Sequence, residues 1–140
     1  MIGNKIHDFA RELWSINRSL TGKGVRKTLK KISKHLPALK IKSVPSQTKV
    51  FDWIVPKEWE VKEAYIISPS GQKICDFLDN NLHLLGYSTP FKGKVTLDEL
   101  KEHLYTLPDQ PDAIPYNTSY YQERWGFCLT QKQFDSLEEG

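Results

Sequence analysis

The sequence predicts an α+β fold, with an N-terminal helical hairpin followed by a small, mostly antiparallel β-rich domain with short helices. Two observations carry this prediction. Apolar residues recur at three-and-four spacing in two segments between residues 4 and 35, which is the period of an amphipathic helix. From residue 39 the apolar and polar residues alternate, and prolines and glycines divide the chain into short segments. The 140 residues suffice for a domain of ordinary size.

The composition is that of an ordinary globular protein, with 26% charged and 39% hydrophobic residues. The net charge of +3 arises from lysines in the first fifty residues, whereas the C-terminal half is acidic. Cys75 and Cys128 have no neighbouring cysteine or histidine at ligand spacing, so we do not expect a structural zinc site. The sequence shows neither a secretory leader nor an apolar run of membrane length. We therefore expect a cytoplasmic protein with free thiols and no membrane partner.

The first expected helix, residues 4–16, has one apolar stripe and one polar face. The break at residues 19–24 places two glycines around a lysine, as a phosphate-cradling loop does. These glycines are too close together for that loop, and they follow a helix instead of a strand. We therefore favour a helix–helix turn, with Ser19 or Thr21 capping a second helix over residues 25–35. The two helices should pack as an antiparallel hairpin.

The second helix has a face of lysines with Arg26 opposite its apolar stripe. A solvated helix face is the favoured interpretation, because no aromatic or glycine-rich motif for reading nucleic acid accompanies it. Nucleic-acid binding through this face is the weaker alternative.

Four short strands should follow, at residues 39–44, 50–55, 59–67 and 72–77, and a proline turn at residues 68–71 should join the last two into a hairpin. Residues 82–87 read as a further strand, in which His83 is favoured as a hydrogen-bonded core histidine. Thr96 and Glu99 form a capping box, which predicts a helix to about residue 104 or 105. Residues 124–129 have strand character. A second capping box, Thr130 with Gln133, begins a short helix through residue 137.

The segment from residue 108 to residue 128 holds three prolines and five aromatic residues, a density that excludes a regular helix or strand. A stiff connector whose aromatic rings cover a core edge is the favoured interpretation from composition alone, with a functional loop as the alternative. The four histidines lie in separate predicted elements. No serine, histidine and aspartate set or metal-binding motif can be assembled from the sequence.

Several segments taken together resemble one family. They are SLTGKGVRKTL at residues 19–29, FDWIVPKEW at 51–59, DNNLH at 79–83, GYSTP at 86–90, LPDQPDAIPY at 107–116, TSYY at 118–121 and RWGFC at 124–128. In order and spacing they resemble the bacterial aminopeptidase-like proteins of uncharacterised function, which are similar to di-zinc aminopeptidases. The resemblance covers the chain from about residue 6 to its end.

The resemblance implies that residues 1–38 are a helical hairpin of a peptidase-like core and that residues 39–140 are a small β-rich inserted domain, cut short at its C-terminal end. In the family the zinc ligands lie downstream of this region. The resemblance therefore implies no cofactor in this chain, zinc in the full-length relatives, and the remainder of a peptidase-like catalytic domain as partner. The chain is then a non-catalytic N-terminal fragment of a zinc metalloprotein.

The stiff aromatic loop would supply candidate substrate contacts, namely Tyr120, Tyr121, Arg124 and Trp125, to a peptide or a carbohydrate-linked substrate. The alternative is a stand-alone module that binds a peptide or a saccharide through this loop. Nucleic acid is the least favoured partner. Because residues missing from the chain would cover the helical hairpin, Leu13, Trp14, Val25 and Leu29 should leave an exposed apolar patch.

Overall fold

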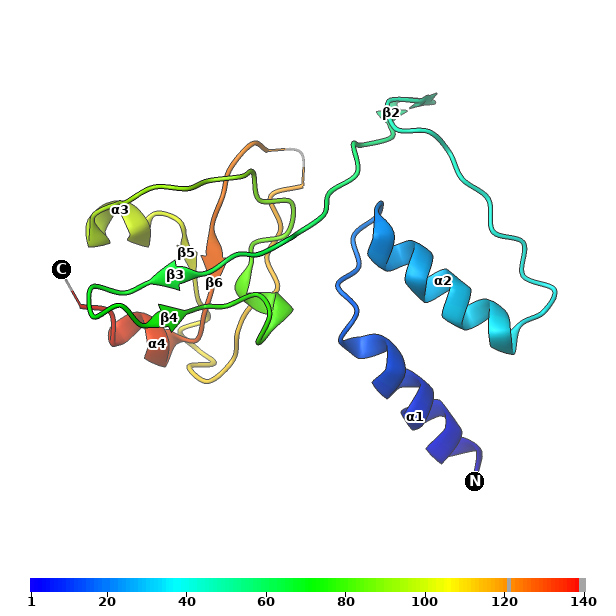
Figure 1. The fold of residues 1–140 in the computed structure, drawn as a ribbon, viewed down its shortest axis with the longest axis horizontal. Helices are drawn as coiled ribbons and strands as arrows, with labels where there is room; N and C mark the ends of the chain where they lie inside the picture. Colours follow the sequence, from blue (N-terminus) through cyan, green and yellow to red (C-terminus); the bar gives the residue numbers. More distant parts are fainter. Residues whose placement is uncertain (121, 139–140) are drawn as a thin grey trace. The chain divides into compact units, whose positions relative to one another are not determined.

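The computed structural model describes residues 1–120 and 122–138. The chain forms two compact units, unit 1 over residues 1–60 and unit 2 over residues 61–140 (Figure 1). Helices, antiparallel hairpins and one parallel strand pair occur together, so the predicted α+β fold is confirmed. The sequence analysis assigned residues 1–38 to a peptidase-like core and residues 39–140 to an inserted domain. This assignment stays a prediction.

Unit 1 begins with two helices of 13 residues, α1 (Ile2–Trp14) and α2 (Lys23–His35). They form the predicted antiparallel hairpin. The Phe9 ring lies 4.5 Å from the His35 ring, and Lys31 Nζ lies 3.1 Å from a Glu12 carboxylate oxygen. Both helices begin two residues earlier than the apolar periodicity predicts.

The turn between the helices depends on its glycines. Gly22 has a φ of 107° and is the N-cap of α2, and a Cβ there would lie 2.9 Å from the Trp59 carbonyl oxygen. A Cβ on Gly24 would lie 1.8 Å from the Asn17 carbonyl oxygen. The predicted cap was therefore wrong, since the Ser19 hydroxyl donates to the Thr21 carbonyl instead. Close backbone approach accounts for the glycines without a phosphate.

The rest of unit 1 is irregular apart from a small antiparallel hairpin, β1 (Lys49–Val50) with β2 (Trp53–Ile54). A single strand over residues 50–55 was predicted, and this was wrong because the chain reverses at Phe51, whose φ is 55°. Residues 39–44 run as irregular backbone instead of the predicted strand. Alternation of apolar and polar residues was not sufficient there, because the described strands of unit 1, β1 and β2, pair with each other and not with this segment.

Unit 2 opens with the predicted hairpin, β3 (Ile66–Ile67) with β4 (Lys73–Ile74), joined by a turn in which Gly71 has a φ of 83°. Its strands are shorter than predicted. The expected strand at residues 82–87 is instead a 3₁₀ turn, η1 (Asn81–His83), followed by isolated bridges from Leu84 and Gly86. The Asn80 side chain accepts from the Leu82 amide and starts this turn.

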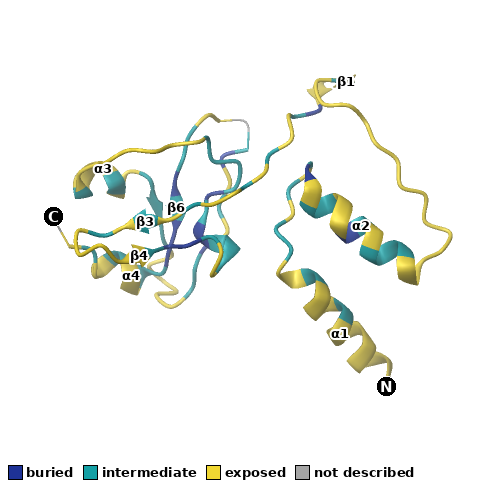
Figure 2. Cartoon of the chain, in the orientation of Figure 1, coloured by how far each residue is buried: buried dark blue, intermediate teal, exposed yellow. Residues whose placement is uncertain are grey.

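Both predicted capping boxes are present. They start α3 (Leu97–Lys101) and α4 (Gln131–Asp135). Both helices are shorter than predicted; after α3 the chain forms β5 (Leu104–Tyr105), which pairs in parallel with β6 (Phe127–Cys128). The core of unit 2 lies beside β6, where Leu85, Cys128 and Leu129 are fully buried. Figure 2 shows buried segments beside β6, whereas α1 is exposed along most of its length.

Candidate functional site

Two loops of unit 2 are joined side by side and carry most of the predicted site residues. The Gly86 amide donates to the Asn117 carbonyl at 2.9 Å, the Ser119 amide donates to the Gly86 carbonyl at 2.8 Å, and the Thr89 amide donates to the Arg124 carbonyl at 3.0 Å. The buried Ser119 hydroxyl adds a bond of 3.0 Å to the Tyr87 carbonyl. These bonds fix the surface formed by residues 86–91 with residues 117–120 and 122–126, which we call the two-loop surface.

Trp125 is the middle ring of a three-ring stack at this surface. Its indole lies 4.2 Å from the Phe91 ring at an interplanar angle of 5°, and 3.7 Å from the His103 ring at 15°. The His103 Nδ1 atom is also 3.0 Å from the Trp125 carbonyl oxygen. Trp125 is therefore half-buried between neighbours, and Phe91, which is 49% exposed, presents its ring to solvent. Stacked aromatic contacts on both neighbours hold the Trp125 ring in place.

Arg124 and Tyr120 lie in the same loop as Trp125. The Arg124 guanidinium donates to the Thr118 carbonyl at 3.3 Å and lies 5.6 Å from the centre of the Tyr105 ring. Its buried Nε atom has no hydrogen-bond partner among the described residues. The Tyr120 ring meets the Tyr87 ring edge to face at 5.4 Å. Both tyrosines have positive φ, 48° and 63°, a backbone strain that surrounding contacts must maintain.

The structure therefore places Tyr120, Arg124 and Trp125 in the segments that form the two-loop surface, each held by its own partners. Tyr121 lies outside the described residues. The sequence analysis missed Tyr87, Phe91 and His103, which complete the aromatic contacts. Tyr87 and Phe91 join the site through pairing between loops more than thirty residues apart, and His103 stacks on a residue 22 positions along the chain, which no local pattern reveals. Aromatic faces, a guanidinium and backbone carbonyls suit binding, and no nucleophile with a base is formed by the described part of this surface.

The core of unit 2 holds a second group of titratable residues. His83 is buried, and its Nδ1 atom lies 2.8 Å from the Cys128 carbonyl oxygen, which confirms the predicted core histidine. Both cysteines are buried free thiols. Burial, with a smaller effect from the nearby Cys128, raises the pKa of Cys75 to about 11, so this thiol is not an activated nucleophile.

Asp76 borders the same core. The Leu78 amide, 2.9 Å from the carboxylate, and the Lys73 ammonium, 3.1 Å away, lower the pKa of Asp76. No three His, Cys, Asp or Glu side chains of the described chain converge as a metal site. The described residues thus do not fit a zinc ion, and no reaction step is assigned through one.

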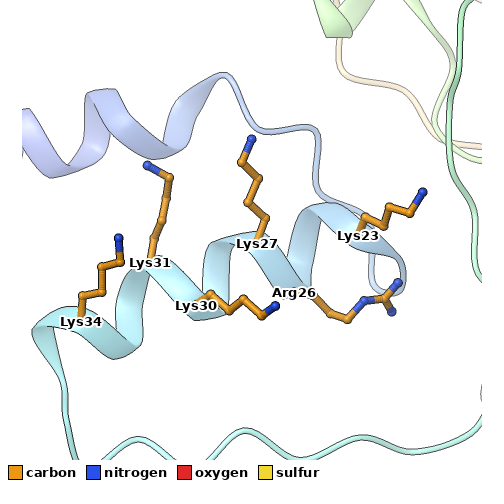
Figure 3. Close-up of a pocket in the computed structure, with 6 residues that line it drawn as sticks. All are labelled: Lys23, Arg26, Lys27, Lys30, Lys31 and Lys34. Carbon is orange, nitrogen blue, oxygen red and sulfur yellow. The ribbon is translucent and has the colours of Figure 1, made fainter.

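The polar face of α2 in unit 1 forms a concavity of about 490 Å³. Figure 3 shows the six side chains that line it, which we call the α2 basic face: Lys23, Arg26, Lys27, Lys30, Lys31 and Lys34. Arg26 pairs with Glu58 through two bonds, the second at 3.1 Å, and this pairing lowers the pKa of the Glu58 carboxyl. The face is thus partly neutralised within unit 1.

Of the residues that the structure describes, none belongs to a helix long and apolar enough to span a lipid bilayer.

Residues 58–140 match the family described as Domain of unknown function (DUF2172). A Clostridium acetobutylicum protein, provisionally named a polysaccharide biosynthesis protein with an aminopeptidase-like domain, is 55% identical over 135 residues. This match covers 96% of the chain and 31% of that relative, in its N-terminal part. A Clostridium acetobutylicum crystal structure, provisionally assigned as a peptidase, is 54% identical with a TM-score of 0.94 over 99% of the chain and 32% of that protein.

The chain thus spans about a third of the length of the relatives that it matches. The matched family covers the whole of unit 2, and the similarity to the Clostridium proteins extends through unit 1 as well. The expected resemblance to bacterial aminopeptidase-like proteins is confirmed. The chain belongs to the DUF2172 domain family, and it is similar along nearly its whole length to bacterial proteins of the aminopeptidase-like kind.

Proposed function

We propose that the chain acts as the N-terminal part of a longer, cytoplasmic, aminopeptidase-like zinc metalloprotein and is itself non-catalytic. The observation that carries this proposal is the uncovered apolar surface of unit 1. At 100° per residue, Ile2, Ile6, Phe9 and Leu13 share one face of α1. Phe9 contacts α2, but Ile6 is 64% exposed and Trp14, at the end of the helix, is 72% exposed.

The β1–β2 hairpin carries further exposed apolar side chains. Phe51 is 93% exposed, and Trp53 and Ile54 are exposed beside it. Among the described residues, Val55 is the single apolar side chain of unit 1 that is buried. A 60-residue unit with so small a core would be marginal alone, and exposed apolar surface of this extent marks an interaction site. The two thirds of the relatives' length outside this chain supply the partner, the remainder of a peptidase-like catalytic domain.

In this proposal the zinc ligands also come from that remainder, because the described residues do not fit the ion. A zinc site of this kind supplies an activated water for hydrolysis. The contribution of this chain is to shape the surroundings of that site. Tyr120, Arg124 and Trp125 on the two-loop surface are the residues proposed to contact a peptide or carbohydrate-linked substrate.

The test is to produce the 140-residue chain and the remaining two thirds of the Clostridium relative as separate polypeptides. We expect zinc and hydrolysis of an aminoacyl p-nitroanilide only when the remainder is present, and a one-to-one complex that Ile6→Ser with Trp14→Ser disrupts. Phe91→Ser, which exposes a polar side chain in unit 2 instead, is the matched control for complex formation. Failure of the two polypeptides to associate would refute the proposal.

The proposed substrate contacts have a test in the same complex. Arg124→Lys keeps the charge but removes the guanidinium plane, and we expect it to raise KM about tenfold with little change in kcat. A lowered melting temperature with an unchanged KM would make Arg124 a structural residue only.

A saccharide- or peptide-binding role for the two-loop surface is the second candidate. The rigid Phe91–Trp125–His103 stack favours it, because an exposed ring held in place can stack on a sugar or an aromatic side chain. The relative named for polysaccharide biosynthesis supports the saccharide as ligand. Calorimetry with neutral oligosaccharides should show binding that Phe91→Ala abolishes. Tyr116→Ala, at another exposed aromatic residue, is the control, and equal losses in both variants would contradict this role.

A further inference from the structure

The α2 basic face gathers positive charge on one side of a single helix. At 3.6 residues per turn, its six cations fall within about 140° of the helix circumference. They line the same concavity, and Figure 3 shows their side chains spread along the helix from Lys23 to Lys34. The apolar stripe of α2 lies on the opposite side, with Leu29 and Ile32 half-buried. The positive charges therefore form one row along the axis of α2.

Half of this charge is already neutralised. Lys23 Nζ lies 3.0 Å from a Glu60 carboxylate oxygen, Lys31 Nζ lies 3.1 Å from Glu12, and Arg26 is paired with Glu58. Lys27, Lys30 and Lys34 have no carboxylate within ion-pair distance in the part of the chain that the structure describes. These three lysines are the charge available to a ligand.

The three lysines are spaced three and four residues apart, so their charges are neighbours on the helix surface. Like charges at this spacing destabilise a helix. They extend about 10 Å along the axis, at 1.5 Å per residue. Neighbouring like charges that no ion pair within the protein compensates are expected mainly at functional sites. An anionic chain lying along the helix would remove this repulsion.

We propose that the α2 basic face binds one strand of an acidic polysaccharide. Lysine ammonium groups reach separate carboxylates as mobile point charges, and their methylene stems offer apolar surface to the faces of sugar rings. Duplex nucleic acid fits this face less well. A duplex binder makes about 6–10 phosphate contacts, and three free lysines supply fewer. The face consists of lysine and arginine side chains, which leaves bases without an aromatic stacking partner, and its one arginine is held by Glu58.

The experiment uses the 140-residue protein and three probes: an oligogalacturonate of about eight units, poly-L-glutamate of the same charge, and a 20-base-pair DNA duplex. Calorimetry at 20 to 200 mM NaCl should give the tightest binding for oligogalacturonate. Its log K should fall with log salt with a slope of about −2, as expected for release of three counterions at about 0.7 each from a single strand.

The variant Lys27→Gln, Lys30→Gln, Lys34→Gln should weaken oligogalacturonate binding at least tenfold at 20 mM NaCl. The matched control is Lys40→Gln, Lys42→Gln, Lys49→Gln, which removes the same charge from exposed positions outside the helix and should change the affinity less than twofold. Circular dichroism checks that both variants keep their helices. Equal losses in the two variants, tighter binding of poly-L-glutamate or DNA, or no binding at 20 mM NaCl would each overturn the proposal.

Discussion

Asp76 is held as a carboxylate by a backbone amide and by an ammonium group. The Leu78 amide and Lys73 lower its pKa, and in return Asp76 raises the pKa of Lys73. Of the two, the amide has the larger effect on Asp76. Because Asp76 lies two residues after β4 at the edge of the unit 2 core, its charge state is coupled to the stability of that unit.

Unit 2 should lose stability in acid because of Asp76. A carboxyl whose pKa is lowered on folding stabilises the fold above its unfolded pKa, about 3.9, and this contribution is lost as the pH falls through the folded value. The melting temperature should therefore fall steeply below about pH 4. Asp76→Asn should melt lower at pH 7 and show a flatter acid profile. Asp79→Asn, at an exposed carboxylate nearby, should keep the wild-type profile, and an identical acid profile for Asp76→Asn would contradict this account.

The Cys75 thiol should be unreactive in the folded protein. With a pKa of about 11, its thiolate fraction at pH 8 is more than 100-fold below that of a free cysteine with a pKa of about 8.5. Iodoacetamide should therefore modify Cys75 at least 100 times more slowly in the native protein than in 6 M guanidinium. Mass spectrometry of the labelled peptides separates Cys75 from Cys128. Native labelling of Cys75 at the unfolded rate would show that the thiol is not buried.

The elements that could be predicted from the sequence are those with a local physical cause. The capping boxes at Thr96 and Thr130 and the helical periodicity of α1 and α2 each depend on residues within a few positions. The strands were predicted less well, because their pairing depends on distant partners. Parallel pairing of β5 with β6, and the turn at Phe51 within an apolar run, have no local signal.

The turn between α1 and α2 depends on the absence of a side chain at Gly24. The Cβ of Gly24→Ala would lie 1.8 Å from the Asn17 carbonyl oxygen, so the backbone must shift. We expect a loss of at least about 2 kcal/mol, as for other overpacked sites, in the unfolding free energy measured by circular dichroism at 222 nm. Gly3→Ala, in α1 with open space around it, should be neutral or stabilise by up to about 1 kcal/mol. Similar effects of both substitutions would show that the turn is not tightly packed.

At the scale of the molecule, the candidate site was predictable in part. The proline and aromatic density of residues 108–128 predicted an irregular segment, and Tyr120, Arg124 and Trp125 lie in its irregular part, whereas its last two residues form β6. The role of these three residues in substrate contact stays a prediction. The partner loop with Tyr87 and Phe91 was not predicted, because the bonds that join the loops link residues far apart in sequence. We expected Leu13, Trp14, Val25 and Leu29 to form an exposed apolar patch. Trp14 is exposed, whereas the other three side chains are half-buried within the helical hairpin.

The uncovered apolar surface of unit 1 is the centre of the proposed function, and the 140-residue protein tests it directly. Sedimentation velocity over a range of concentrations, with a hydrophobic dye present, measures self-association and exposed apolar surface together. We expect concentration-dependent association and strong dye binding, both reduced by Ile6→Ser with Trp14→Ser and unchanged by Phe91→Ser. A compact monomer that binds no dye at any concentration would contradict the proposal that unit 1 needs the rest of a longer protein to complete its core.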